Sequence, residues 1–205
     1  MAHNQSDEVG SDPKKFGLKF DKEKPKWELI PFETLMSIIE IPRYIIEKDI
    51  DSFDLLNFNR TEVLNHVLKI ISYWRVDNPI YRGILGIHDL SLASFGILYL
   101  IRGKSYTEEE INASDEKFRW DLFDLQDIDA IANIYTMGAR KYAPNNWKLV
   151  DPERYFGALM RHLITVNTVH KYDSELGCMH LHQAVWNMMS IIWLENDFDK
   201  EELTE

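Results

Sequence analysis

The stretch that decides the fold is residues 138–194, which reads GARKYAPNNW at 138–147, RYFGALMRH at 154–162, YDSELG at 172–177 and HLHQAVWNMMSIIWL at 180–194. Apolar residues recur in it at the three- and four-residue spacing of an amphipathic helix. Basic, amide, imidazole and carboxylate side chains interrupt these apolar helices. Because a buried polar group costs free energy unless it finds a partner, this pattern indicates a functional site on a helical scaffold.

The remainder of the chain also predicts helices, and no run of residues has the alternation of a strand. We expect helices over residues 31–41, 62–74, 89–101, 128–138, 152–170 and 180–195. Thr61 and Asp151 are the expected N-caps of two of them, and Pro42 is expected to stop or kink the first. Thr107 and Glu110 have the spacing of a capping box and predict a short helix or connector. The sequence therefore places the protein in the all-α class.

Composition narrows the class of protein further. Hydrophobic residues make up 45% and aromatic residues 12% of the 205 positions, which is enough for a sizeable core. The net charge of -11 argues against a nucleic acid duplex as partner, because duplex binding needs a basic face. The single cysteine, Cys178, fits a reducing compartment. With no secretory signal and no membrane-spanning run evident, we expect a cytoplasmic protein.

An internal repeat is indicated when the chain is slid along itself. A shift of 91 positions places Glu62 on Glu153 and Leu90 on Leu181, whereas it places Gly96 opposite Asn187. Scaffold positions agree between the copies, while polar positions are confined to the second copy. The alternative is that two sets of apolar helices align by chance. The domain prediction that follows is a flexible tail at 1–15, a degenerate scaffold repeat at 16–103, a linker at 104–116, the repeat that carries the site at 117–195 and an acidic tail at 196–205.

One polar stripe runs along the last helix. His180, Gln183, Asn187 and Ser190 are spaced i, i+3, i+7 and i+10, so they share one face among apolar neighbours. Either this face is a wall that contacts a ligand, or it is a buried hydrogen-bond network between helices.

Cationic side chains lie on the preceding helix and at the end of the one before it. Arg154 and Arg161 are seven residues apart on one side of a mostly apolar helix, a costly arrangement unless they meet an anion. A phosphate suits the guanidinium fork, although an ion pair with Asp173 or Glu175 would satisfy Arg161 as well. Lys141 has the further alternative of stabilising a helix end.

Two other short segments carry candidate groups. Asp173 and Glu175 stand two residues apart in a loop, which suits a hard divalent cation such as Mg²⁺ or Mn²⁺. The turn at Asn146 and Trp147 can recognise a base through its amide and indole, or Trp147 can simply cap the core.

These residues together resemble a known family. The run Gly138-Ala139-x-Lys141-Tyr142, followed by Asn145-Asn146-Trp147, Tyr155, Arg161-His162, Asp173-x-Glu175-x-Gly177 and His180-Leu181, is similar to part of the phage dATP/dGTP diphosphohydrolase family. Those proteins resemble the all-α, MazG-like nucleoside triphosphate pyrophosphohydrolases. The resemblance covers mostly residues 117–195. It implies a helical bundle built from two tandem, diverged MazG-like repeats and, for a phage protein, the host cytoplasm as compartment.

The resemblance also implies an activity and a set of roles. The expected reaction is metal-dependent hydrolysis of a dATP- or dGTP-like nucleotide to a monophosphate and pyrophosphate, with Mg²⁺ or Mn²⁺ as cofactor. The implied catalytic residues are His162, Asp173 and Glu175; the substrate-binding residues are Lys141, Arg161, Asn146, Trp147 and Asn187; the metal ligands are Asp173, Glu175 and His180.

A second function is left open by two departures from the family pattern. Val169-His170 stands where the family often has Gly-Glu, and Gln183 stands where it often has a second histidine. The alternative is therefore a protein that binds and sequesters a nucleotide or nucleotide-derived signal with weakened catalysis. A purely structural helical protein is a third option, and a homo-oligomer is compatible with all three.

Overall fold

The computed structural model describes residues 24–48, 54–75, 87–112, 119–166, 171–174 and 176–195. Its α-helices are α1 (Phe32–Ile39), α2 (Ile41–Lys48), α3 (Arg60–Arg75), α5 (Ile87–Arg102), α6 (Glu108–Asn112), α7 (Leu125–Lys141), α8 (Pro152–Val166) and α9 (His180–Glu195). Three 3₁₀ turns join them: η1 (Trp27–Leu29), η2 (Trp120–Leu122) and η3 (Asn146–Leu149). Over these ranges the only β pairing is an isolated bridge between Tyr172 and Met179. The all-α prediction is confirmed.

Local capping chemistry explains where the helices begin. The α8 start is as expected, because Asp151 Oδ1 accepts a hydrogen bond from Glu153 N at 2.9 Å and Pro152 needs no donor at the first helical position. Thr107 and Glu110 form the expected reciprocal capping box at 2.7 and 3.1 Å.

Three expected boundaries differ in detail. The cap of α3 is Asn59, not Thr61, because Asn59 Oδ1 accepts from Thr61 N at 3.1 Å and leaves Thr61 inside the helix. The helix break comes at Glu40, before Pro42, which then occupies the first turn of α2 where a proline is tolerated. Helix α7 runs three residues past its expected end, to Lys141. The tails at 1–15 and 196–205, and His170, lie outside the described residues.

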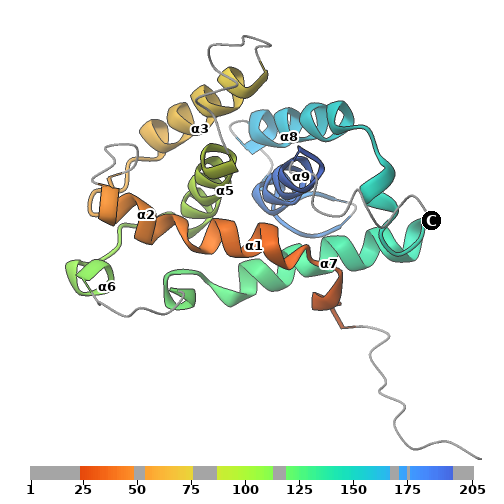
Figure 1. Cartoon of the computed structure of the whole chain (residues 1–205), viewed down its shortest axis with the longest axis horizontal. Helices are drawn as coiled ribbons and strands as arrows, with labels where there is room; N and C mark the ends of the chain where they lie inside the picture. The colour runs from red at the N-terminus through yellow and green to blue at the C-terminus, as the bar shows by residue number, and fades with distance from the viewer. Residues whose placement is uncertain are drawn as a thin grey trace, which may run out of the picture.

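The helices stack in three layers around a central pair (Figure 1). Helices α5 and α9 lie side by side in the centre and pack against each other. Helix α3 covers α5 and helix α8 covers α9 on one side, while α1 and α2 contact α5 and α7 contacts α9 on the other. Because α9 is enclosed by α5, α7 and α8, its polar residues must be satisfied inside the protein or by a ligand.

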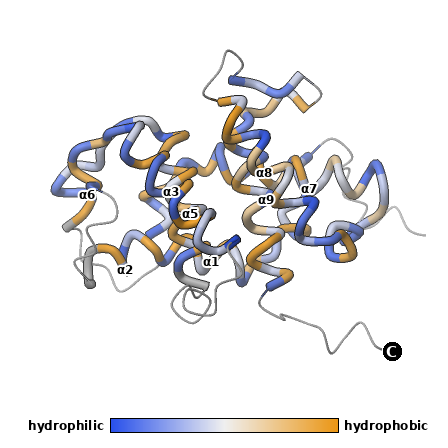
Figure 2. Tube along the Cα trace, turned by 90° about the horizontal axis from the view of Figure 1, so that it is seen from above, coloured by the Kyte–Doolittle hydropathy of each residue, from blue (hydrophilic) through white to orange (hydrophobic). Residues whose placement is uncertain are grey.

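Burial follows this arrangement. Hydrophobic residues concentrate along α5 and α9, whereas α3 and α6 present hydrophilic stretches at the periphery (Figure 2). Phe95 and Tyr99 of α5 and Met189 and Ile192 of α9 are fully buried. No helix in the described ranges is both long and apolar enough to span a membrane.

The two halves of the chain present their elements in the same order. The series η1, α1–α2, α3, α5 is followed, after the short helix α6, by η2, α7, α8 and α9, with the additional turn η3 between α7 and α8. Adding the shift of 91 to α3 gives 151–166, and α8 spans Pro152–Val166. This correspondence agrees with a duplicated unit, in which the single helix α7 takes the place of the broken pair α1–α2. The tandem repeat itself stays a prediction.

Candidate functional site

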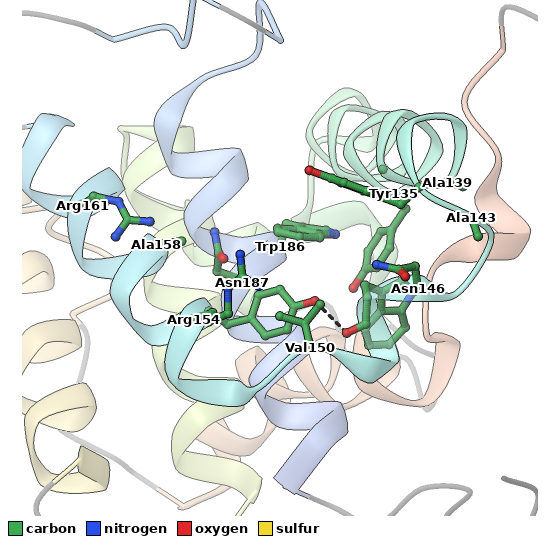
Figure 3. Close-up of a pocket in the computed structure, with 14 residues that line it drawn as sticks. Tyr135, Ala139, Ala143, Asn146, Val150, Arg154, Ala158, Arg161, Trp186 and Asn187 are labelled. Atoms are coloured by element: carbon green, nitrogen blue, oxygen red, sulfur yellow. Dashed lines mark hydrogen bonds between the residues drawn. The ribbon is translucent and has the colours of Figure 1, made fainter.

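A pocket of about 330 Å³ opens between α7, the η3 turn, α8 and α9. This volume lies at the small end of the range of about 300–1,000 Å³ typical of small-molecule sites. Its lining consists of aromatic rings, small residues, two arginines and two asparagines: Tyr135, Gly138, Ala139, Tyr142, Ala143, Asn146, Trp147, Val150, Arg154, Tyr155, Ala158, Arg161, Trp186 and Asn187. Figure 3 shows Trp186 and Asn187 of α9 between Arg154 and Arg161 of α8 and Tyr135 and Ala139 of α7.

The chain reversal after α7 builds one end of this pocket. Asn145 adopts the left-handed conformation at φ 61°, a geometry that asparagine tolerates better than most residues. The η3 turn that follows buries Trp147. Tyr155 OH then donates a hydrogen bond to the Trp147 carbonyl at 2.7 Å, which fastens η3 to α8 (Figure 3).

Edge-to-face ring contacts hold the aromatic walls in place. Tyr135 contacts Trp147 and Trp186 at centroid distances of 5.4 and 5.8 Å, and Tyr155 contacts Trp186 at 5.4 Å. Such pairs are worth roughly 0.5–1.5 kcal/mol each beyond area burial. Burial raises the pKa of Tyr135 and of Tyr155 above its usual value, so both phenols stay neutral. The walls are therefore uncharged and preorganised.

Several buried polar atoms of the pocket lining have no hydrogen-bond partner in the described part of the chain. They are Tyr135 OH, Trp147 Nε1, Trp186 Nε1 and Asn187 Oδ1. Leaving a buried donor or acceptor unpaired costs about 1–3 kcal/mol. Such atoms at the wall of a pocket indicate a place where a ligand or water completes the hydrogen bonding.

Two guanidinium groups stand at the α8 side of the pocket. Arg154 and Arg161 both have exposed side chains, and neither forms a salt bridge with a residue inside the described ranges. Arg161 Nη1 lies only 3.4 Å from the position that a Cβ on Gly157 would take, so the side chain extends back over that glycine. These two cations are available to an anionic ligand.

A pair of histidines lies next to Arg161 in sequence. His162 Nδ1 of α8 and His180 Nδ1 at the start of α9 are 3.0 Å apart. Burial, the neighbouring His180 and Arg161 lower the pKa of His162 to about 4, against an opposing contribution from Asp173. His162 is then neutral near pH 7, and a hydrogen bond between the two Nδ1 atoms requires that one of them carries the hydrogen and the other accepts it.

Asp173 sits in a tight turn before α9. Its Oδ1 accepts a hydrogen bond from Leu176 N at 2.9 Å, and Gly177 closes the turn at φ 67°, a conformation that favours glycine. The turn brings the carboxylate close enough to raise the pKa of His162. The carboxylate and the two imidazoles therefore lie near one another where α8 meets the start of α9, and none of the three is among the residues that line the pocket.

Comparison with known proteins finds similarity over the segment that builds this pocket. Residues 107–203, which contain every pocket-lining residue, match a family described as dATP/dGTP diphosphohydrolase, N-terminal. A dATP/dGTP diphosphohydrolase of Salmonella phage PMBT28 is 30% identical over 76 residues, which cover 37% of this chain and 26% of that protein. The resemblance to the dATP/dGTP diphosphohydrolase family is confirmed. The chain thus matches about a quarter of this relative's length, and no solved structure matches it.

The pocket gathers most of the residues expected to bind substrate. Arg161, Asn146, Trp147 and Asn187 all line it, from three different elements. Lys141 is not among the lining residues; its Nζ lies 5.6 Å from the ring of its neighbour Tyr142, which does line the pocket. The roles of these five residues stay predictions.

The expected metal ligands are only partly described. Asp173 and His180 lie within the described residues, while Glu175 lies outside them. No group of three or more histidine, cysteine, aspartate or glutamate side chains in metal-binding reach occurs among the residues that the structure describes. The metal site therefore stays a prediction.

His182 precedes Gln183 and lies off the polar stripe of α9. It contacts another helix and not the pocket. Its Nε2 lies 2.8 Å from Asp127 Oδ1 of α7, and the two side chains are 8% and 16% exposed. This contact joins α9 to α7 across 55 residues of sequence.

Sequence reasoning missed Tyr135 and Trp186 as pocket residues, because aromatic residues at helical spacing are usually core. One signal was present in α7, where Tyr135, Gly138, Ala139 and Tyr142 are spaced i, i+3, i+4 and i+7. Small residues between two tyrosines on one helix face leave a hollow beside aromatic rings.

Proposed function

We propose that the pocket between α7, α8 and α9 binds a purine deoxynucleoside triphosphate and that the protein hydrolyses it to a monophosphate and pyrophosphate. The observation that carries the proposal is the combination of an aromatic-walled pocket with two guanidinium groups that lack carboxylate partners in the described chain. Aromatic rings stack on a base at about 1–3 kcal/mol per base, and arginine forks match phosphate oxygens. The family match and the phage relative, named for dATP and dGTP, support the same ligand.

The polarity of the pocket sets the orientation of the substrate. The neutral wall of Tyr135, Tyr155 and Trp186 takes the base, and the α8 edge with Arg154 and Arg161 takes the phosphates. The proposal further requires that the His162–His180 pair and Asp173, which do not line the pocket, come close to the reacting phosphoanhydride when the substrate is bound. Water attacks the α-phosphorus, the bond from that phosphorus to the bridging oxygen breaks, and pyrophosphate leaves.

The histidine pair supplies a neutral acceptor for the proton of that water. A pKa of about 4 keeps His162 neutral at pH 7, so one ring nitrogen of the pair remains unprotonated. A general base needs such a lone pair within reach of the water it activates. Asp173 then favours the protonated ring that results, because it raises the pKa of His162.

A divalent cation is part of the proposal. Mg²⁺ in proteins is commonly held by one or two carboxylates together with substrate phosphates, rather than by a cage of protein ligands. Asp173 fits this pattern, and Glu175 and His180 are the further expected ligands. The ion would neutralise phosphate charge and favour attack at phosphorus.

The test is product analysis with a matched pair of variants. Purified protein is incubated with each of the four dNTPs and Mg²⁺, and nucleotides are separated by anion exchange. We expect dAMP or dGMP with pyrophosphate, and strongly reduced turnover for Asp173→Asn but not for Asp151→Asn, a change at the exposed cap of α8. Turnover that is equal in wild type and Asp173→Asn would remove Asp173 from the reaction.

A second function is favoured by one observation. His170 and Gln183 stand where the resembled family often has a glutamate and a second histidine. A binding protein that sequesters a nucleotide without cleaving it has the same pocket. Calorimetry that finds tight, metal-independent binding together with no product formation would establish this function instead.

A further inference from the structure

The amide of Asn187 has a fixed orientation inside α9. Its Nδ2 donates a hydrogen bond to the carbonyl of Gln183, one turn earlier, at 2.7 Å. The reversed amide would place Oδ1 against that carbonyl oxygen, a repulsive contact, so Oδ1 must be the atom that faces away from it. The residue is 1% exposed and lines the pocket.

Asn187 Oδ1 therefore presents an acceptor without a donor. It has no hydrogen-bond partner in the described part of the chain, although the side chain is buried almost completely. In Figure 3 the Asn187 side chain lies beside Trp186, between the two arginines and the α7 wall. A ligand that fills the pocket and leaves this oxygen unpaired loses affinity, because the desolvation of the oxygen is then not compensated.

The atoms around this acceptor define what a matching ligand carries. Trp186 Nε1 and Trp147 Nε1 are buried donors without partners in the described residues, and ring contacts fix both indoles. An unpaired acceptor and two unpaired donors on residues that line the same pocket complement a flat ring system with an N–H donor and ring lone pairs on its edge. An aminopurine has this combination, whereas an unsubstituted purine keeps the lone pairs and lacks the amine donor.

We propose that Asn187 Oδ1 accepts a hydrogen bond from the exocyclic amine of the purine base and thereby selects aminopurine nucleotides over analogues without that amine. The inference rests on the proposed function, since it assigns the base end of the same pocket. A single acceptor that can meet either N6 of adenine or N2 of guanine also accounts for one pocket accepting both bases. The residue is then a specificity determinant, not a participant in phosphate chemistry.

The first experiment leaves the protein unchanged and alters the ligand. Dissociation constants are measured by calorimetry with Ca²⁺ in place of Mg²⁺, to slow turnover, for dATP against the triphosphate of unsubstituted purine deoxyriboside and for dGTP against dITP. We expect each analogue that lacks the amine to bind about 10- to 100-fold more weakly, the range for a buried acceptor left unpaired. Equal affinities within both pairs would overturn the inference and leave the proposed function standing.

The second experiment assigns the discrimination to Asn187. Asn187→Leu keeps the size of the side chain and removes its polar atoms, so dATP and its analogue should bind equally well to it. Ser94→Ala of α5 is the control, because its buried hydroxyl donates a hydrogen bond to the Leu90 carbonyl at 2.9 Å and it does not line the pocket; it should keep the full discrimination. Asn187→Ser offers a milder change if the leucine variant does not fold. Discrimination that persists in a folded Asn187 variant would overturn the assignment, while absence of any dNTP binding by the wild type would refute the proposed function itself.

Discussion

Removal of the Arg161 guanidinium is the sharpest perturbation of the phosphate end of the pocket. The side chain is exposed and has no carboxylate partner in the described residues, so Arg161→Ala should change the free energy of unfolding by less than about 0.5 kcal/mol. Any loss of nucleotide affinity then reports on binding and not on folding.

The size of the expected loss follows from the exposure of the group. A hydrogen bond to a charged partner contributes about 1.5–3 kcal/mol, and solvent screening of an exposed arginine favours the lower end. A loss of about 1.5 kcal/mol corresponds to a roughly tenfold rise in the dissociation constant of dATP. Deoxyadenosine, which has no phosphate, should bind with unchanged affinity.

The assay compares wild type, Arg161→Ala and Arg140→Ala by calorimetry at two salt concentrations. Arg140 is an exposed cation in the last turn of α7 that does not line the pocket, so its removal controls for net charge. The account predicts a tenfold effect at Arg161, little effect at Arg140 and a weaker salt dependence for the Arg161 variant. An equal loss in both variants, or an equal loss for deoxyadenosine and dATP, would refute a direct phosphate contact.

Three further outcomes are expected. The folded-state pKa of His162, about 4 against an ordinary 6.5, means that the unfolded state binds more protons between these values. Stability should therefore fall by about 1–2 kcal/mol, after discounting for solvent screening, as pH drops from 6.5 to 4; denaturant unfolding of wild type and His162→Gln checks this, and identical pH profiles would contradict it. Gly157→Ala should stabilise the protein by about 0.5–1 kcal/mol, because alanine favours the helix interior and the new Cβ meets only the flexible end of Arg161 at 3.4 Å. Thermal melts of wild type and variant test this. A lower melting temperature for the variant would show that the Arg161 side chain cannot move away from the new Cβ. A chelator should abolish dNTP turnover yet leave the melting temperature unchanged, since Mg²⁺ is proposed to be held with the substrate phosphates; a chelator-induced drop in melting temperature would instead indicate a structural metal.

Much of the fold could be predicted because its helices carry their own signals. Apolar periodicity predicted the last helix over 180–195, and α9 has these bounds. The pair Asp151-Pro152 predicted the start of α8 correctly. Competing caps are harder to rank, which is why Asn59 was overlooked in favour of Thr61 although both residues are good N-caps.

The pocket could be predicted only in part, for a physical reason. Arg161 and Asn187 stood out because polar residues in apolar helices need partners, and both line the cavity. Tyr135 and Trp186 did not stand out, because an aromatic wall has the same spacing as a core. The His182–Asp127 contact joins positions 55 residues apart and depends on how α9 packs on α7, which local pattern does not encode.

In the proposed reaction, the pocket binds a dNTP and the protein cleaves it between its α- and β-phosphates. The most direct measurement follows dATP labelled at the α-phosphorus, incubated with wild-type protein and Mg²⁺, with ¹⁸O-water as solvent and mass analysis of the products. The account predicts dAMP and pyrophosphate in equal amounts, with one ¹⁸O on the dAMP phosphate. Formation of dADP and inorganic phosphate, or no product with either dATP or dGTP, would contradict it.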